Sequence, residues 1–462
     1  MSLSNKHIRV EKLLPLLLAL ALILSMAGCG QPAAAPAAAP AAAPTAVPQA
    51  AAPTAAPQAA APTEAPKAAG PSKVFKIGVD GPFSGPAAKN GEEFKRSFQM
   101  AMEAINYTVG DYKIEPVFID DQSDPAKGAS AYEQAIVQDK IQAGVLNWNS
   151  SVAVALMELT AKYKIPHFFG FGATEVVNET FASDPAKYGY WMLKGWPAPA
   201  KLAISYVAAL EDAIAKGSFK PESKTVALAG EDTDWGRSFL GAIKGQFQAK
   251  GWTVVAEEYF PIDQSEFTPL MTKLKGLNPA VLASTCTATP VSSALIKQAE
   301  QAGLKSLIIA DGLGWAGNWY DLTGKASNYV LDQIPQLATA KGKAYATAYE
   351  TKYGDKPSPS AGGLAFDGTN FFIAVLNETI KANNGELTGD GIYKWVKENV
   401  WTGKWTYKDG IVMPEYKYTA DTIPDPVVGP GEYMFPVLQY FDGESKIVYP
   451  NDIATQALQG KP

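Results

Sequence analysis

The feature that most constrains the fold of this chain is an alternation of apolar strand patterns with amphipathic helix patterns, which occurs twice. The first run starts with an apolar segment at 74–79 and a helical pattern at 92–106. The second run starts after the break Gly195-Trp196-Pro197-Ala198-Pro199. Strands that alternate with helices form parallel sheets that the helices cover. The pattern therefore predicts an α/β fold of two Rossmann-like lobes, each with a parallel central sheet.

The expected elements follow from apolar periodicity and from helix start and stop residues. Asp124 before Pro125 is typical of a helix N-cap followed by proline in the first turn. Strands are predicted at 74–79, 113–119, 143–146, 166–169, 225–229, 252–259, 281–284 and 307–310, and helices at 92–106, 125–140, 151–163, 200–215, 237–250, 266–277, 290–302 and 368–380.

The first 72 residues are unlike the rest of the chain. Three basic residues precede the apolar stretch 13–24, which is too short to span a bilayer comfortably and is typical of a signal peptide. Met26-Ala27-Gly28-Cys29 resembles a bacterial lipoprotein cleavage site, which implies a signal peptide at 1–28 and a lipid on Cys29. An ordinary signal peptide is the alternative. The Ala/Pro-rich segment 29–72 is predicted to be a disordered tether, because its prolines prevent a helix.

Composition excludes several classes of function. The net charge is −6, and Arg96 and Arg237 are the only arginines after the signal segment, which argues against nucleic-acid binding. Cys286 is the only cysteine besides Cys29, and His167 is the only histidine besides His7. Any His-based zinc site or catalytic triad must therefore use His167, which we interpret as a buried strand residue. We expect no catalytic residue, metal or cofactor.

Ligands of open parallel sheets bind beyond the carboxyl ends of the strands. Most of the loops that follow the predicted strands contain a large aromatic residue, with Ser, Thr, Asn and Asp nearby. These residues are Phe83, Trp148, Phe171, Trp235 and Trp315. The pattern predicts a cleft with aromatic walls and a few polar anchors.

Several short motifs occur in a characteristic order between residues 73 and 450. They are Gly81-Pro82-Phe83-Ser84-Gly85, Ser150-Ser151-Val152-Ala153, Lys164-Ile165-Pro166 with Gly172-Ala173-Thr174, Asp234-Trp235-Gly236, Gln298-Ala299 with Gly303-Leu304-Lys305, and Gly363-Leu364-Ala365-Phe366-Asp367-Gly368. Together they resemble the type I periplasmic binding proteins of ABC importers, in the branched-chain amino acid (Leu/Ile/Val) class. The resemblance implies two lobes that are joined by three crossings and close on a ligand.

The resemblance also implies roles for individual residues. Ser150, Gly172 and Thr174 would hold a ligand carboxylate, and Trp235 and Asp311 would hold its ammonium group. Ser150 and Ser151 lie at the N-terminus of the helix predicted at 151–163, where free N–H groups favour an anion. Trp235 offers a π-face to a cation.

Other positions make the ligand less certain. Trp148 and Phe83 are further candidates for the wall of the site. Asn90 and Ala288 stand where an aromatic contact is expected in the amino-acid binders, which argues against leucine. Amino acids remain the first candidates, followed by amides, urea-like solutes and aromatic carboxylates.

The resulting hypothesis is an exported, lipid-anchored solute-binding protein that captures a small polar ligand and delivers it to ABC permease subunits, as a monomer. Its expected segments are lobe 1 at 73–196, lobe 2 at 197–330, a return mainly to lobe 1 at 331–400 and a final crossing to lobe 2 at 401–462. A ligand-sensing receptor is the alternative. Gly312-Leu313-Gly314-Trp315-Ala316-Gly317 matches a dinucleotide fingerprint, but no clear helix opens on it, so an exported enzyme is disfavoured.

Overall fold

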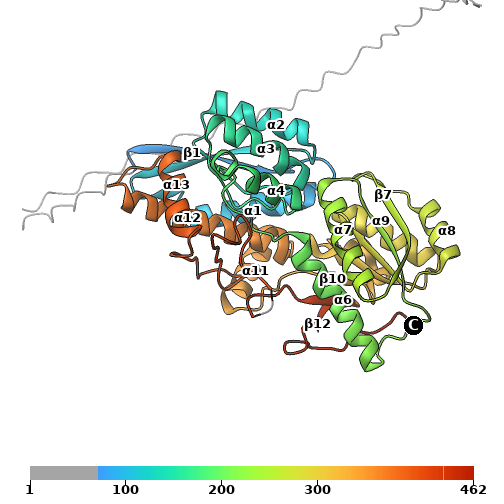
Figure 1. Cartoon of the computed structure of the whole chain (residues 1–462). Coiled ribbons are helices and arrows are strands. Elements are labelled where there is room, and N and C mark those ends of the chain that lie inside the picture. Colours follow the sequence, from blue (N-terminus) through green and yellow to red (C-terminus); the bar gives the residue numbers. More distant parts are fainter. Residues whose placement is uncertain (1–70, 430) are drawn as a thin grey trace, which may run out of the picture. The chain divides into compact units, whose positions relative to one another are not determined.

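The structure is a computed structural model that describes residues 71–429 and 431–462. The predicted signal peptide, the lipidation at Cys29 and nearly all of the tether lie outside the described residues. The described chain forms two sheets with helices on both faces (Figure 1), which confirms the predicted α/β class.

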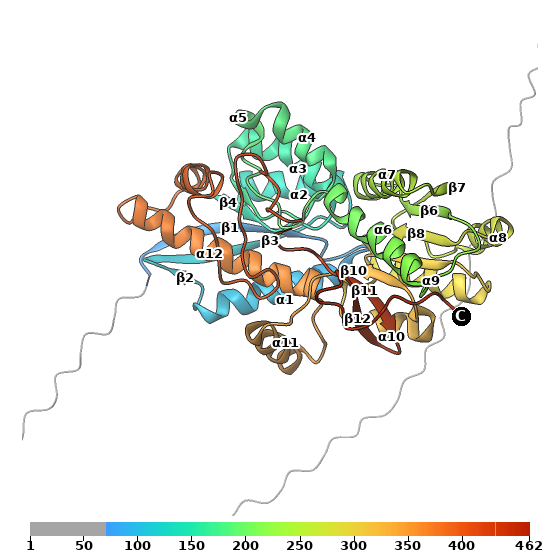
Figure 2. The same ribbon diagram turned by 60° about the horizontal axis from the view of Figure 1, so that its bottom comes forward.

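The first sheet has five strands in the order β2-β3-β1-β4-β5. All neighbours are parallel except β2, which runs antiparallel to β3. Helices α2 and α3 cover one face, and α1 and α12 cover the other (Figures 1 and 2). We call this sheet and its helices the first lobe. Its elements are β1 (Lys73–Gly81), α1 (Ala88–Ala104), β2 (Thr108–Val109), β3 (Tyr112–Asp120), α2 (Pro125–Gln134), η1 (Ala135–Asp139), β4 (Ala143–Val145), α3 (Ser150–Tyr163), β5 (His167–Phe168), α4 (Glu175–Ser183), α5 (Pro185–Tyr188), η4 (Pro359–Gly363), α12 (Leu364–Ala382), α13 (Gly389–Trp395) and η5 (Val396–Val400).

The second sheet has seven strands in the order β12-β11-β10-β9-β8-β6-β7. Strands β6 to β10 are parallel, and the hairpin β11–β12 adds two antiparallel strands beside β10. We call this sheet and its helices the second lobe. Its elements are α6 (Pro199–Lys216), β6 (Thr225–Glu231), α7 (Asp234–Ala249), β7 (Thr253–Phe260), α8 (Thr268–Leu277), β8 (Val281–Thr285), α9 (Thr289–Gln301), β9 (Leu307–Asp311), η2 (Leu313–Trp315), α10 (Trp319–Thr323), η3 (Gly324–Ser327), β10 (Leu331–Gln333), β11 (Val437–Phe441) and β12 (Glu444–Tyr449).

Alternate side chains of β6 bury against opposite helix layers. Val226 and Leu228 belong to the cluster that contains Phe239 of α7, whereas Ala227 belongs to the cluster that contains Met271 of α8. This period of two is what a strand covered on both faces requires. It explains why the central strands of this lobe are continuously apolar.

Within the described residues the chain crosses between the lobes three times. It leaves the first lobe through 194–198, which lead into α6, and returns after β10 through α11 (Ala340–Tyr353). It leaves again after η5 and reaches β11 through 401–429 and 431–436. No helix of the described part has the length and apolarity that crossing a membrane requires.

Candidate functional site

A small cavity lies where the strand-end loops of the two lobes meet. Its volume is about 20 Å³, which is room for about one water molecule. It is lined by Trp148, Ser150, Phe171, Ala173, Trp196, Trp235, Thr287, Trp315 and Ser360. Residues of both lobes, of the first crossing and of η4 thus converge on one place. The lobes close on each other there, and aromatic side chains nearly fill the space between them.

Trp315 stands at the centre of the aromatic wall. Its ring centroid lies 5.4 Å from that of Trp148, 5.5 Å from that of Trp235 and 6.0 Å from that of Trp196. The angles between the ring planes are 90°, 60° and 77° respectively, so the rings meet edge to face or tilted. A ligand larger than water fits here only if these side chains move apart, and it would then contact indole rings from four different segments.

The loop that carries Trp315 is held by buried polar groups. Asp332 accepts hydrogen bonds from the N–H groups of Gly312 (3.2 Å) and Gly314 (2.7 Å), and Asn90 Nδ2 donates to the carbonyl of Trp315 (3.0 Å). Gly312 has a φ of +109°, which only glycine adopts easily. The glycines thus fit a fixed turn beneath Trp315, and the match to a dinucleotide fingerprint is accounted for by this packing.

The amino end of α3 faces the cavity through Ser150. Asn149, the N-cap residue, makes no side-chain bond to the helix, so the N–H groups of the first turn lack a side-chain cap. Ser150 Oγ accepts from the N–H of Thr174 at 3.3 Å, and its own hydroxyl proton remains free to be donated. Such a helix end with a hydroxyl suits an anionic group.

The other first-lobe candidates surround this end without lining the cavity. Gly172 N–H donates to Asn147 Oδ1 (3.1 Å), and a Cβ at Gly172 would lie 2.1 Å from that of Ala153. Thr174 caps α4 by accepting from Val176 N–H at 3.3 Å. These two residues shape the loop that holds Ala173, so their direct contact with a ligand stays a prediction.

Two candidates lie away from the cavity. Asp311 is fully buried; its carboxylate accepts from Tyr206 Oη (2.8 Å) and Thr285 Oγ1 (3.3 Å). Burial and the nearby Asp332 raise the pKa of Asp311 well above its ordinary range, which disfavours a charged partner for an ammonium group. Phe83 is half-buried and packs edge to face on Phe118, with ring centroids 5.6 Å apart. The structure therefore brings neither side chain to the cavity.

Trp235 lines the cavity, as does Trp148, but both of their N–H groups are engaged within the protein. Trp235 Nε1 donates to Thr285 Oγ1 (2.8 Å), and Trp148 Nε1 donates to the carbonyl of Thr287 (3.0 Å). Their rings, and not their N–H groups, are the surfaces left for a ligand.

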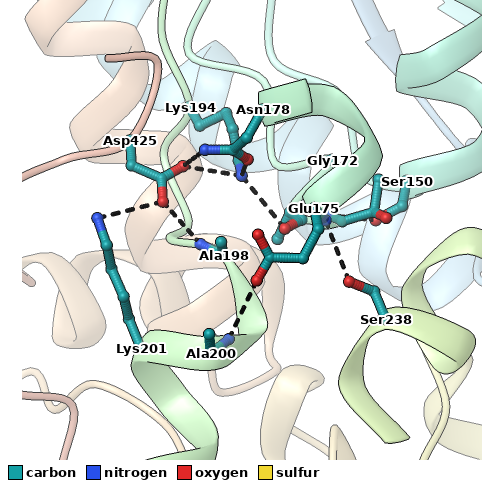
Figure 3. A network of polar contacts seen from close by, with 12 residues as sticks. Ser150, Gly172, Glu175, Asn178, Lys194, Ala198, Ala200, Lys201, Ser238 and Asp425 are labelled. Atoms are coloured by element: carbon teal, nitrogen blue, oxygen red, sulfur yellow. Dashed lines mark hydrogen bonds and ion pairs between the residues drawn. The ribbon is translucent and has the colours of Figure 1, made fainter. Parts of the chain in front are cut away.

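Direct hydrogen bonds join the two lobes around the cavity. Besides the bond from Trp148 to Thr287, Ser151 Oγ accepts from Asp234 N–H at 3.1 Å. Glu175 N–H donates to Ser238 Oγ at 3.1 Å (Figure 3). Ser151 therefore contacts the opposite lobe in this closed arrangement, and its contact with a ligand stays a prediction.

A buried ion pair joins the first and third crossings beside the site (Figure 3). Lys194 Nζ lies 2.8 Å from Asp425 Oδ1, and both side chains are almost completely buried. Lys194 Nζ also donates to Asn178 Oδ1 (2.6 Å) and to the carbonyl of Ala173 (3.2 Å), which lines the cavity. Asp425 accepts in addition from Ala198 N–H at 3.0 Å. Two of the crossings between the lobes are thus linked to the wall of the site.

Besides Ala173, which lies between the predicted site residues Gly172 and Thr174, sequence reasoning missed three residues of the wall as site candidates. Trp196 lies in the Pro/Gly break between the two runs, where the pattern indicated only a boundary. Thr287 precedes Ala288, where an expected aromatic contact is missing, and Ser360 lies in a segment without a clear pattern. The tryptophan in the break was the one available signal, because a large indole is unusual in a simple linker.

Comparisons with known proteins agree with this architecture. The family model of periplasmic binding proteins matches residues 74–403. Leu/Ile/Val-binding protein homolog 8 of Brucella abortus is 25% identical over 319 residues, which cover 65% of this chain and 76% of the relative. The structure of the branched-chain amino acid transporter substrate-binding protein of Streptococcus pneumoniae in complex with isoleucine aligns with a TM-score of 0.64 at 19% identity, covering 82% of this chain and 100% of that one.

A second solved structure is a solute-binding protein of an ABC transporter from Rhodopseudomonas palustris in complex with benzoate. It aligns with a TM-score of 0.67 at 17% identity and covers 84% of this chain and 99% of that one. At these identities the structural likeness establishes the fold, and it includes proteins with chemically different ligands.

Proposed function

The chain belongs to the periplasmic binding protein family, with the type I fold, and on this premise we propose that it captures a small apolar or aromatic carboxylate outside the cytoplasm and delivers it to an ABC import permease. The observation that carries the proposal is the aromatic cavity that both lobes form around Ser150 and the amino end of α3. A lipid on Cys29 would keep the protein at the membrane; that residue lies outside the described part of the chain.

The chemistry of the wall supports a carboxylate in preference to an amino acid. None of the nine described residues that line the cavity carries an ionisable side chain. The amino end of α3 and the Ser150 hydroxyl provide donors for an anion, whereas Asp311, the expected partner of an ammonium group, is engaged by Tyr206 and Thr285. A zwitterion would therefore bury its ammonium group without a counter-charge, which is unfavourable.

Closure follows from the placement of the wall residues on both lobes. A ligand that contacts Ser150 on one side and Trp235 on the other interacts with both only when the lobes are closed. Its contacts then shift the population towards the closed state by their differential free energy. The interlobe bond from Trp148 to Thr287 would add to the closed state alone.

We expect Ser150→Ala to weaken the binding of benzoate about tenfold in isothermal titration calorimetry, the effect of removing one hydrogen bond to a charged group. Ser183→Ala is a matched control, because the exposed Ser183 bonds only within its own helix. If wild type binds a panel of amino acids but no aromatic carboxylate, the proposed ligand class is wrong. Loss of benzoate uptake on deletion of the gene would test the delivery step.

A further inference from the structure

Three residues that line the cavity each have a buried polar atom without a hydrogen-bond partner within the protein. These atoms are Nε1 of Trp196, Nε1 of Trp315 and Oγ of Ser360, and the three residues are 5%, 4% and 1% exposed. Indole nitrogen can only donate a hydrogen bond. Buried donors without partners are rare in folded proteins, so each one requires an explanation.

The other two tryptophans of the wall provide an internal comparison. Trp148 and Trp235 line the same cavity, yet their N–H groups are bonded to Thr287 and Thr285. The protein therefore provides a hydrogen-bond acceptor for two of the four indole N–H groups and none for the other two. The difference points to a bonding partner that arrives with the ligand.

We propose that the ligand carries a neutral hydrogen-bond acceptor besides its carboxylate, and that the N–H groups of Trp196 and Trp315, with the Ser360 hydroxyl, bind it. This inference rests on the proposed function. A pyridine-type nitrogen or a carbonyl oxygen has the required chemistry. An ammonium group does not, because it would set donors against donors.

The donors are held in place by their own segments. Asp332 and Asn90 fix the loop of Trp315, as described above. Trp196 lies between Lys194 and Ala198, whose backbone N–H groups donate to Pro424 O (2.8 Å) and Asp425 Oδ2 (3.0 Å). Donors that are fixed in advance bind an acceptor with little ordering cost, and they reject an analogue that lacks it.

The test compares ligands of one shape that differ by one acceptor. Wild type is titrated calorimetrically at pH 8 with benzoate and with the three pyridinecarboxylates, in which a ring nitrogen replaces one C–H. We expect at least one pyridinecarboxylate to bind about tenfold more tightly than benzoate, the effect of satisfying a buried donor. This comparison needs no variant and so does not depend on the folding of one.

Variants then identify the donors. Trp315→Phe and Trp196→Phe keep an aromatic ring and remove the N–H. Each variant should lower the affinity for the preferred pyridinecarboxylate about tenfold, so that its preference over benzoate is lost. The affinity for benzoate should change by about twofold at most. Trp191→Phe is the matched control, because the buried indole of Trp191 also lacks a partner but stacks on His167 away from the cavity.

Three outcomes would overturn the inference. If wild type binds all four acids equally, or if the variants weaken all four alike, the acceptor subsite is wrong while the proposed carboxylate binding stands. If wild type binds none of the four, the subsite is wrong, and so is the proposed binding of aromatic carboxylates.

Discussion

Replacing Asp425 with leucine should lower the free energy of unfolding by about 3–5 kcal/mol, because it leaves the buried Lys194 ammonium with no carboxylate in contact. The Lys194 side chain is 0% exposed and that of Asp425 is 2% exposed. Only Asn178 Oδ1 and the carbonyl of Ala173 would remain as acceptors for Lys194. Neither carries the charge that compensates for removing an ammonium from water.

The measurement is urea denaturation at pH 7.5, followed by circular dichroism. In the double variant Lys194→Met/Asp425→Leu both charges are gone, and most of the lost stability should return. Lys201→Ala is the control, because Lys201 contacts the same carboxylate at 3.3 Å with a side chain that is 34% exposed. We expect it to change stability by at most about 1 kcal/mol. A single variant Asp425→Leu as stable as wild type would show that the pair is not effectively buried.

The predictable part of the fold was the part with local periodicity. The strands and helices of both βα runs lie where apolar spacing indicated them, with ends that differ by a few residues. The helix predicted at 125–140 ends its regular turns at Gln134 and continues as the π-helical turn η1. Such a change of hydrogen-bond register leaves no mark in the apolar pattern.

The carboxyl third was less predictable for two physical reasons. Helix α11 has no apolar stripe and buries mainly Tyr345 and Tyr349, whose polar ends hide the helical period. Strand β11 pairs with β10, more than 100 residues earlier, through Leu331 and Gln439. Pairings over such distances depend on the path of the intervening chain, which local patterns do not report.

The site also has residues that the sequence could predict and residues that it could not. Trp148, Ser150 and Trp235 follow or begin regular elements, so the rule for parallel sheets located them at the cavity. Asp311 also ends a strand, but Tyr206 reaches it from α6, which no local pattern predicts. Trp196 belongs to a crossing, whose position depends on how the two lobes meet.

A second large effect is expected from His167 at acid pH. Burial lowers the pKa of His167 from its ordinary 6.5 to about 3. Its ring stacks on Trp191 at 4.3 Å, its Nε2 bonds to the carbonyl of Leu146, and Tyr132 Oη lies 2.9 Å from Nδ1. A donor at Nε2 and an acceptor at Nδ1 fit the neutral ring. Protonation would therefore place an unpaired charge in the first-lobe core.

The direction in which stability changes with pH follows from the difference in proton binding between the folded and unfolded chains. Between pH 6.5 and 3 the unfolded chain binds a proton at this histidine and the folded chain does not, so stability falls as the pH falls. From pH 7 to pH 5 the loss from His167 alone should be about 2 kcal/mol. Buried Glu93 acts in the opposite direction: burial raises its pKa from 4.5 to about 7, so its contribution to stability grows as the pH falls through that window.

Because these contributions oppose each other, the informative quantity is the difference between two pH profiles. Urea denaturation of wild type and His167→Phe at pH 7 and pH 5 gives that difference. Phenylalanine leaves the carbonyl of Leu146 unpaired at both pH values, so this defect cancels. We expect the variant to lose about 2 kcal/mol less than wild type on acidification. Equal losses would mean that His167 titrates alike in the folded and unfolded chains, and thus that its ring is reached by water in the native state.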